Sequence, residues 1–291
     1  MSRVAVAAAG GRPLAVRLPS SPWLLVLPFL AVLAVFYVVP IGQVLWLSFS
    51  DPTLGFGNYA RLASSESLQR VLLTTFRVCA TTTFFAITLG YLIAYVMIHA
   101  GPTHRLWITG FVLVPFWISL LVRAFAWLTL LRSEGIINNA LIGLGVIDQP
   151  LPLVYNEFAV VIGMVHYMVP YAVLPLYANM KGIDPRLADA SRSLGAGAGR
   201  TFLSVTLPLS MPGIVAAGLL VFILTLGFFV TPAILGGGKV VMIAEYVSVQ
   251  VLKTVRWGVG TMMASVLLAT VVFLLIAMAK VVDVRQMFGA K

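Results

Sequence analysis

The sequence offers few groups that could carry out a reaction. The histidines His99, His104 and His166 do not combine with other ligands at a spacing that binds a metal. The single cysteine, Cys79, lies in an apolar stretch, which favours a buried and inert thiol, and it has no partner for an internal disulfide. No nucleophile, general acid or general base forms a recognisable set, so we predict no catalytic residue, no metal site and no enzymatic activity.

Two glycine-rich stretches are poor matches to nucleotide-binding motifs. Gly236–Lys239 lacks the upstream glycine and the following Ser or Thr of a phosphate-binding loop. Gly195–Gly199 has the glycine density of a dinucleotide fingerprint, but it follows an expected helix where that motif follows a strand. We therefore predict no bound cofactor in this chain.

The most informative polar residues lie in a loop at about residues 181–208, between two apolar runs. Asp184 is a good N-cap, and the proline after it suits the first position of a short helix, Pro185–Leu194. Gly195 can adopt the left-handed conformation that ends a helix. A second short helix is expected from about Gly199 to Pro208.

Such a loop could present a stiff surface to another protein. Within its first helix, Asp189 and Arg192 are spaced i, i+3 and could pair with each other. Force applied to the loop would tilt the two flanking apolar segments. The alternative is a solvated helical hairpin without a partner, and the spacing alone does not decide between the two.

Composition places the chain in a membrane. Of its 291 residues, 60% are apolar and 10% are charged, too few charges to cover a water-soluble protein of this size. The net charge of +10 comes from basic residues that stand singly between apolar runs, so nucleic acid is not an expected partner, whereas lipid is.

Apolar runs long enough to cross a bilayer predict an all-α membrane protein with about six transmembrane helices. We expect a tail at residues 1–22 and a transmembrane domain at residues 23–291. The six expected spans are Trp23–Phe49, Leu72–Ile98, Leu106–Leu131, Phe158–Met180, Met211–Leu235 and Thr261–Val282.

Loop charges predict the orientation. With the N-terminus in the cytoplasm, 11 Lys and Arg residues fall on the cytoplasmic side and 6 on the other, in accord with the positive-inside rule. Both termini and the 181–208 loop are then cytoplasmic. Arg77 and Arg123 fall within or near the spans, where charge is costly. We expect Arg77 to reach outward to water, and Arg123 either to bond carbonyls of a kinked neighbour or to lie in a gate or substrate path.

The 181–208 loop resembles the "EAA" signature of permease subunits of bacterial binding-protein-dependent ABC importers. That signature is Glu-Ala-Ala, three residues, Gly, nine residues, then Ile-x-Leu-Pro. The chain has Asp189-Ala190-Ser191, then Gly195, then Val205-Thr206-Leu207-Pro208 at the same spacing, with Asp, Ser and Val as conservative departures. A wider resemblance, closest to spermidine/putrescine-type permeases and their iron- and phosphonate-importing relatives, extends from about Pro28 to Phe288.

The resemblance implies a type I importer permease of the bacterial inner membrane. Its partners would be a pair of ATPase subunits that bind ATP and magnesium, a second and non-identical permease, and a periplasmic substrate-binding protein. The implied ATPase-coupling residues are Asp189, Ala190, Ser191, Arg192, Gly195, Val205, Leu207 and Pro208. Weaker candidates for the substrate path or gate are Trp117, Arg123, Trp127, Phe229 and Pro232.

The implied substrate is a polyamine or a similar small solute, with phosphonate, ferric iron or another solute as alternatives. A cationic polyamine conflicts with Arg123, and an anionic solute does not. More remote alternatives are an ion-coupled secondary transporter, which would need ionisable residues at mid-membrane, and a purely structural subunit.

Overall fold

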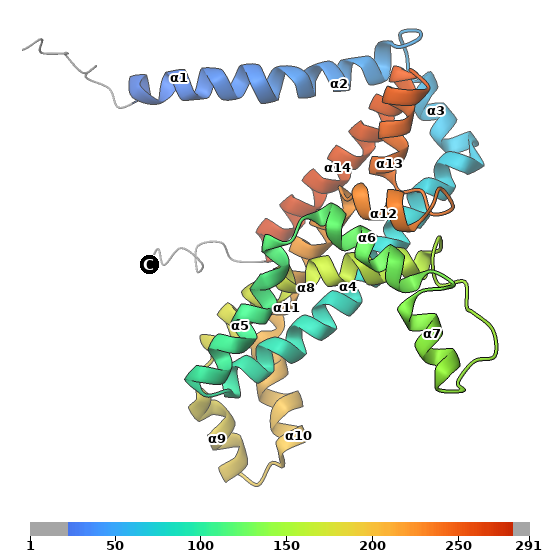
Figure 1. The fold of residues 1–291 in the computed structure, drawn as a ribbon. Coiled ribbons are helices and arrows are strands. Elements are labelled where there is room, and N and C mark those ends of the chain that lie inside the picture. Colours follow the sequence, from blue (N-terminus) through green and yellow to red (C-terminus); the bar gives the residue numbers. More distant parts are fainter. Residues whose placement is uncertain (1–22, 282–291) are drawn as a thin grey trace, which may run out of the picture. The chain divides into compact units, whose positions relative to one another are not determined.

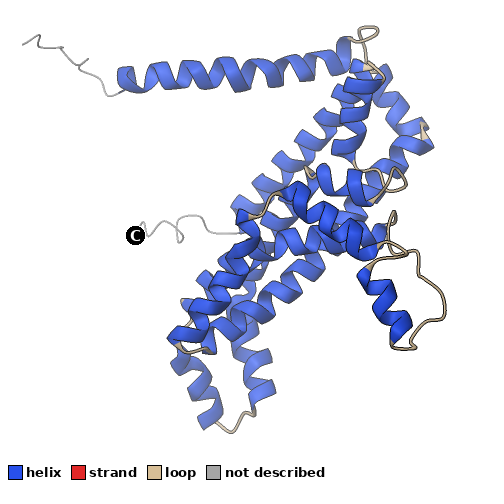
Figure 2. Cartoon of the chain, in the orientation of Figure 1, coloured by secondary structure: helices blue, strands red, loops and turns tan. Residues whose placement is uncertain are grey.

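The computed structural model describes residues 23–281, and the regular structure of these residues is helical throughout, without strands (Figures 1 and 2). Contacts divide the chain into two units, residues 1–44 and 45–291. The predicted tail at residues 1–22 lies outside the described residues.

The described part of the first unit is an apolar helix. It comprises α1 (Trp23–Leu33), a π-helical turn (Ala34–Val38) and the start of α2 (Val39–Ser50). Side chains 26–43 are all exposed. Because so much exposed apolar surface is unfavourable in water, this helix requires lipid or a neighbouring protein around it.

The core of the second unit is built by three long helices that pack on one another: α4 (Glu66–His99), α8 (Glu157–Lys181) and α11 (Leu207–Leu226). Their contacts bury Met168, Leu176 and Val221 completely. α8 stays helical through Pro170 and Pro175. These helices confirm the second and fourth predicted spans, and α14 (Trp257–Val281) corresponds to the sixth, whose predicted end at Val282 lies beyond the described residues.

The third predicted span, Leu106–Leu131, is wrong as one continuous helix. It is divided into α5 (Pro102–Trp117) and α6 (Leu120–Leu131), and the axes of Pro102–Trp117 and Leu120–Gly143 differ by 99°. Between them, Ile118 has φ −87° and ψ 129°, which is an extended conformation. Pro115 cannot donate a backbone hydrogen bond, which weakens the last turn of α5 before this break.

The fifth predicted span, Met211–Leu235, is displaced at both ends. A continuous helix runs over Ala198–Leu226, through α10 (Ala198–Thr201), a π-helical turn (Phe202–Thr206) and α11. The separate second short helix expected to end at Pro208 is therefore also wrong. The π-helical turn widens the backbone just before Pro208, which accommodates the missing N–H without ending the helix. The helix ends at Gly227, and Val230–Leu235 forms a separate helix, α12.

Shorter helices connect the long ones. They are α3 (Gly57–Ser64), α7 (Ile136–Gly143), α9 (Pro185–Ser193) and α13 (Ile243–Ser248), which a π-helical turn (Val249–Lys253) follows. Within residues 23–281, five helices are long and apolar enough to cross a membrane, or six if α5 and α6 count as one broken span. This agrees with the predicted fold class.

Candidate functional site

The connection between α8 and α11 begins with the short helix α9. The carboxylate of Asp184 accepts a 2.9 Å hydrogen bond from the backbone N–H of Arg186, and Pro185 occupies the first helical position. Both features satisfy the start of the helix locally, because the first N–H groups of a helix have no partners within it. They confirm the predicted cap and start.

The end of α9 is fixed by a glycine. Gly195 has φ +87°, in the left-handed region. Its N–H donates to the carbonyl of Arg192 at 2.9 Å, and the N–H of Ala196 donates to that of Ser191 at 3.1 Å. This pair of bonds is the Schellman arrangement, in which glycine is favoured because it has no Cβ. The helix therefore has a defined stop, as the sequence predicts.

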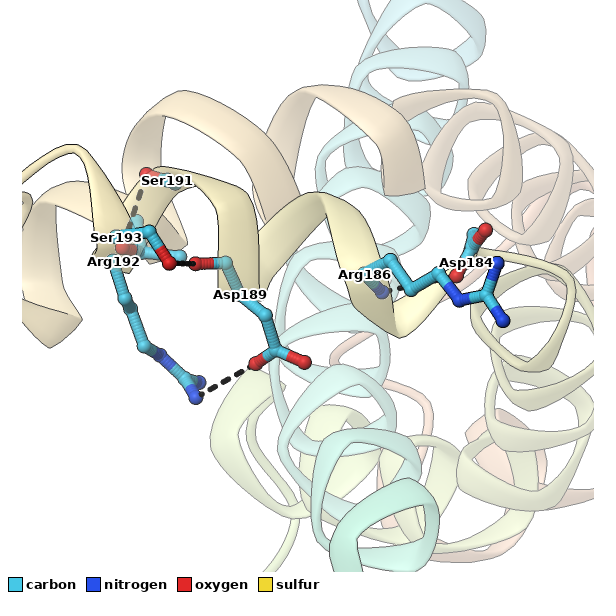
Figure 3. Close-up of polar contacts among 7 residues, drawn as sticks. Asp184, Arg186, Asp189, Ser191, Arg192 and Ser193 are labelled. Carbon is cyan, nitrogen blue, oxygen red and sulfur yellow. Dashed lines mark hydrogen bonds and ion pairs between the residues drawn. The ribbon is translucent and has the colours of Figure 1, made fainter.

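α9 packs against α10, at the start of the next helix. The hydroxyls of Ser191 and Thr201 lie 3.2 Å apart, and Thr201 is buried. The carbonyl of Asp189 also accepts a bond from the hydroxyl of Ser193 at 3.1 Å (Figure 3). The Ser191–Thr201 contact joins α9 to α10 at the end of the α8–α11 pair (Figure 1), whereas the Ser193 bond lies within α9. The loop is thus a braced helical hairpin and not a flexible coil.

The outer face of α9 is open. None of its residues is buried, and Leu194 beyond its end is 89% exposed. Arg192 donates to the carboxylate of Asp189 at 3.4 Å, and both side chains remain largely exposed (Figure 3). Exposed pairs of this kind contribute about 1 kcal/mol or less, so either partner could exchange this contact for one with another protein.

A second group of side chains lies at the break between α5 and α6. Arg123 is in the first turns of α6, and its guanidinium carbon lies 4.3 Å from the centre of the Tyr167 ring on α8. One turn further, the indole N–H of Trp127 donates to His166 Nδ1 at 3.1 Å. Arg123 and Trp127 of α6 thus each contact a ring on α8.

Two hollows adjoin this group. A cavity of about 110 Å³ is lined by Pro115, Phe116, Arg123, Tyr167, Pro170 and Tyr171. A larger and more open one, about 550 Å³, lies between α4, α5, α6 and α8 and is almost entirely apolar, with Trp127 and His166 among its lining residues. The break between α5 and α6 thus leaves space beside the Arg123–Tyr167 contact.

Comparison with known proteins decides the family. Residues 86–286 match the model of the binding-protein-dependent transport system inner membrane component. The chain belongs to this family. It is therefore a permease subunit of an ABC importer, a multi-pass protein of the inner membrane and not an enzyme.

The most informative relatives of this permease are permeases as well. The spermidine/putrescine transport system permease protein PotB of Haemophilus influenzae is 32% identical over 86% of this chain and 88% of its own length. PotB of Escherichia coli K12 is 33% identical over 73% of this chain and 77% of its own. A bacterial alginate ABC transporter, in complex with an alginate pentasaccharide-bound periplasmic protein, has a chain with the same fold, at a TM-score of 0.72 and 18% identity over 92% of this chain and 95% of that one.

The permease structure distributes the predicted coupling residues over two elements. Asp189, Ala190, Ser191 and Arg192 lie on α9, and Gly195 ends it. Val205 lies in the π-helical turn, and Leu207 and Pro208 open α11. Val205 and Leu207 are half-buried, whereas Pro208 is exposed. The first group forms the free surface of the hairpin and the second attaches it to the membrane helix.

The predicted path residues are only partly brought together. Arg123 and Trp127 lie on α6 facing α8, and Pro232 is buried in α12, which packs against both helices. Phe229 is exposed just before α12. Trp117, at the end of α5, is 89% exposed, so it does not pack closely against the other described helices of this chain. Arg77 forms an ion pair with Glu157 at the start of α8, and its side chain remains largely exposed, which is compatible with the expected outward direction.

Three aromatic or imidazole groups of this region were not predicted: His166, Tyr167 and Tyr171. Tyr167 and Tyr171 are four residues apart on the fourth span, so they share one helical face, and that spacing was the available signal. His166 and Tyr167 meet α6, and Tyr171 meets Phe116 of α5, on the two sides of the break at Ile118, which hydrophobic length alone does not predict.

Proposed function

We propose that this permease imports polyamines such as spermidine or putrescine, driven by a partner ATPase that docks on α9. The proposed substrate rests on the similarity to two spermidine/putrescine permeases over most of both chains. The proposed coupling to an ATPase rests on the exposed helical hairpin between two long helices, whose two short helices contact each other.

The hairpin suits the transfer of force. α9 is fixed at its start by Asp184 and at its end by Gly195, and it reaches the membrane helices through α8 on one side and the Ala198–Leu226 helix on the other. A displacement of α9 would therefore move both helices, which pack on each other and on α4. A solvated hairpin with no partner would not need this bracing.

The complete importer would contain four kinds of partner contact. Two ATPase subunits would bind ATP and magnesium and receive α9 on the cytoplasmic side. Both termini of this chain would lie on that same side of the membrane. A second, non-identical permease and the lipid would cover exposed apolar surface, such as that of residues 26–43. A periplasmic binding protein would deliver the solute to the opposite face.

An anionic solute such as a phosphonate is the second candidate. Among the described residues, Arg123 is the only charged residue that lines the 110 Å³ cavity, and its buried Nε has no hydrogen-bond partner among them. A phosphonate oxygen could accept from it. The similarity to two polyamine permeases outweighs this local preference, because it extends over most of the chain.

Uptake in proteoliposomes tests the proposed function. The permease is reconstituted with the ATPase, second permease and binding protein of the same transport system, and the uptake of labelled spermidine, putrescine and a phosphonate is compared. We expect polyamine uptake that requires ATP on the α9 side. Uptake that continues without ATP and collapses with a proton uncoupler would indicate a secondary transporter, and uptake of the phosphonate alone would refute the polyamine assignment.

Cross-linking tests the docking surface directly. Cys79 is buried and can be replaced by alanine to give a cysteine-free chain. Ser193→Cys then places a thiol on α9, and Leu144→Cys places a matched thiol on the exposed residue after α7. We expect Ser193→Cys alone to cross-link to the ATPase and to react with impermeant maleimide from the cytoplasmic side. Cross-linking from Leu144→Cys alone would reverse the proposed orientation.

A further inference from the structure

The cavity at the α5–α6 break has the features of a cation site. Aromatic rings form much of its wall: Tyr167 and Tyr171 lie stacked with centres 5.7 Å apart, and Phe116 lies 5.0 Å from Tyr171. Ring faces carry partial negative charge and attract cations within about 6 Å of their centres. The tyrosine hydroxyls, 3.4 Å apart, add two oxygen acceptors to the same wall.

The backbone favours a cation in the same place. Pro115 and Phe116 belong to the last turn of α5, where carbonyl groups lack the regular i+4 partner; the carbonyl of Pro115 accepts only a 3.3 Å bond from the N–H of Ile118. The end of a helix carries partial negative charge, and broken membrane helices use such ends to hold cations. The C-terminal end of α5 therefore adds to the attraction of the rings.

The cation that occupies this site in the structure is Arg123 itself. Its guanidinium carbon lies 4.3 Å from the centre of the Tyr167 ring, yet its buried Nε has no hydrogen-bond partner within residues 23–281. Arg123 also lies near the N-terminus of α6, where the helix dipole disfavours a positive charge. The ring and the end of α5 thus attract Arg123, whereas the N-terminus of α6 opposes its charge and its Nε is unsatisfied among the described residues, so a second cation could replace it.

We propose that the guanidinium of Arg123 occupies a cation site on Tyr167 and Tyr171, and that an ammonium group of the transported solute displaces it. We call Arg123 in this role the plug of the site. Two cations cannot occupy the same ring face, so solute entry and arginine departure are linked. This removes the conflict between Arg123 and a polyamine, since the arginine acts as a competitor and not as a ligand. The inference rests on the proposed polyamine substrate.

Solute affinity of the purified importer without its binding protein tests the plug. Spermidine binding is measured by calorimetry for the wild type, Arg123→Gln, Arg123→Lys, Tyr167→Leu and Tyr167→Phe. We expect Arg123→Gln to bind spermidine about three- to thirtyfold more tightly, the range that corresponds to one cation–π contact, because the competitor is gone. Arg123→Lys, which keeps a cation, should bind as the wild type does.

The ring variants separate this role from a merely structural one. Tyr167→Leu should weaken binding more than Tyr167→Phe, which keeps the ring face and loses only the hydroxyl acceptor. In the double variant with Tyr167→Leu the change at Arg123 should no longer matter. Arg70→Gln is the matched control, since it removes an arginine whose side chain is 73% exposed, at the start of α4. Unchanged or weaker spermidine binding by a folded Arg123→Gln importer would overturn the proposal.

The failure of the proposed function can be told apart from the failure of the plug. If the wild type transports no polyamine, the proposed function fails, whatever Arg123 does. Tetramethylammonium then serves as the probe of the ring site, because it needs no transport: tighter binding to Arg123→Gln than to the wild type still supports the plug, and equal binding refutes it.

Discussion

The carboxylate of Asp51 accepts a 2.6 Å hydrogen bond from the backbone N–H of Gly258, a residue 207 positions further along the chain. A Cβ at residue 258 would lie far inside contact distance of the Asp51 carbonyl oxygen. The contact joins the turn after α2 to the first turn of α14. The carboxylate also lies where a helix N-terminus favours negative charge. One end of the last membrane helix is therefore fixed by a residue from the beginning of the second unit.

Gly258→Ala should destabilise the permease. The added methyl group must push the two backbones apart, and overpacking of this kind costs about 1–3 kcal/mol. We expect a lower midpoint of thermal unfolding in detergent, measured by tryptophan fluorescence. Gly110→Ala is the control, because a Cβ at Gly110 of α5 meets nothing within 4 Å. Equal midpoints for the two variants would mean that the close approach is relaxed at no cost.

Gly195→Ala should impair coupling without impairing membrane insertion. The left-handed conformation at residue 195 costs about 1–2 kcal/mol for a residue with a Cβ. This corresponds to about a five- to thirtyfold decrease in the equilibrium constant for forming the native C-terminal end of α9. We expect a several-fold decrease in ATP-driven uptake and in ATPase copurification. Gly197→Ala provides a matched control two residues away, since both positions have open space for a Cβ and only Gly195 has a positive φ. If both variants transport equally, the left-handed backbone conformation that ends α9 is irrelevant to coupling.

The sequence was sufficient where local signals act alone. Hydrophobic length predicted α4, α8 and α14, because a span must bury some 20 apolar residues whatever its neighbours are. Asp184, Pro185 and Gly195 predicted the bounds of α9 to within a residue, since caps and left-handed glycines act within a few positions of the chain. For α9 the local preference and the final structure coincide.

The sequence was insufficient where two opposing local signals had to be weighed. Pro170 and Pro175 remain inside α8, whereas the chain breaks just after Pro115. Pro208 suggested a helix end, but a π-helical turn carries the helix past it. Apolar content extended the fifth span to Leu235, although that residue is buried in α12. These outcomes depend on packing between helices, and so does the contact of Arg123 with Tyr167.

Asn138→Leu should loosen the segment between α7 and α8. Asn138 is fully buried, and its side chain donates to the carbonyls of Arg132 and Leu151 at 3.1 and 3.0 Å and accepts from the N–H of Leu151 at 2.8 Å. Leucine is similar in size but leaves the N–H of Leu151 unpaired, at about 1–3 kcal/mol if it stays buried. The two carbonyls keep their bonds from the N–H groups of Gly135 and Leu153. We expect faster amide exchange at Leu151 by mass spectrometry. Asn139→Leu, one residue on and exposed, should leave exchange at Leu151 unchanged.

Glu245→Gln should change how the stability of the permease depends on pH. Glu245 lies in α13, outside the candidate spans, and its Oε2 is buried without a hydrogen-bond partner. Burial raises the pKa of this carboxyl group, and the positive charge of Lys253 offsets part of the rise. The folded state therefore holds the proton to higher pH than the unfolded state does. It follows that the stability contribution of Glu245 is retained at acidic pH and lost as pH rises from about 4.3, the unfolded value, through the folded pKa.

Glutamine carries no charge at any pH, so Glu245→Gln should remove this loss. We expect the thermal midpoint of the variant to exceed that of the wild type at pH 7 and the difference to shrink toward pH 4. Glu66→Gln controls for net charge, because the Glu66 side chain is 85% exposed. A difference that grows as the pH falls would show that the ionised form of Glu245 is stabilised in the folded permease, by a partner that the described residues do not supply.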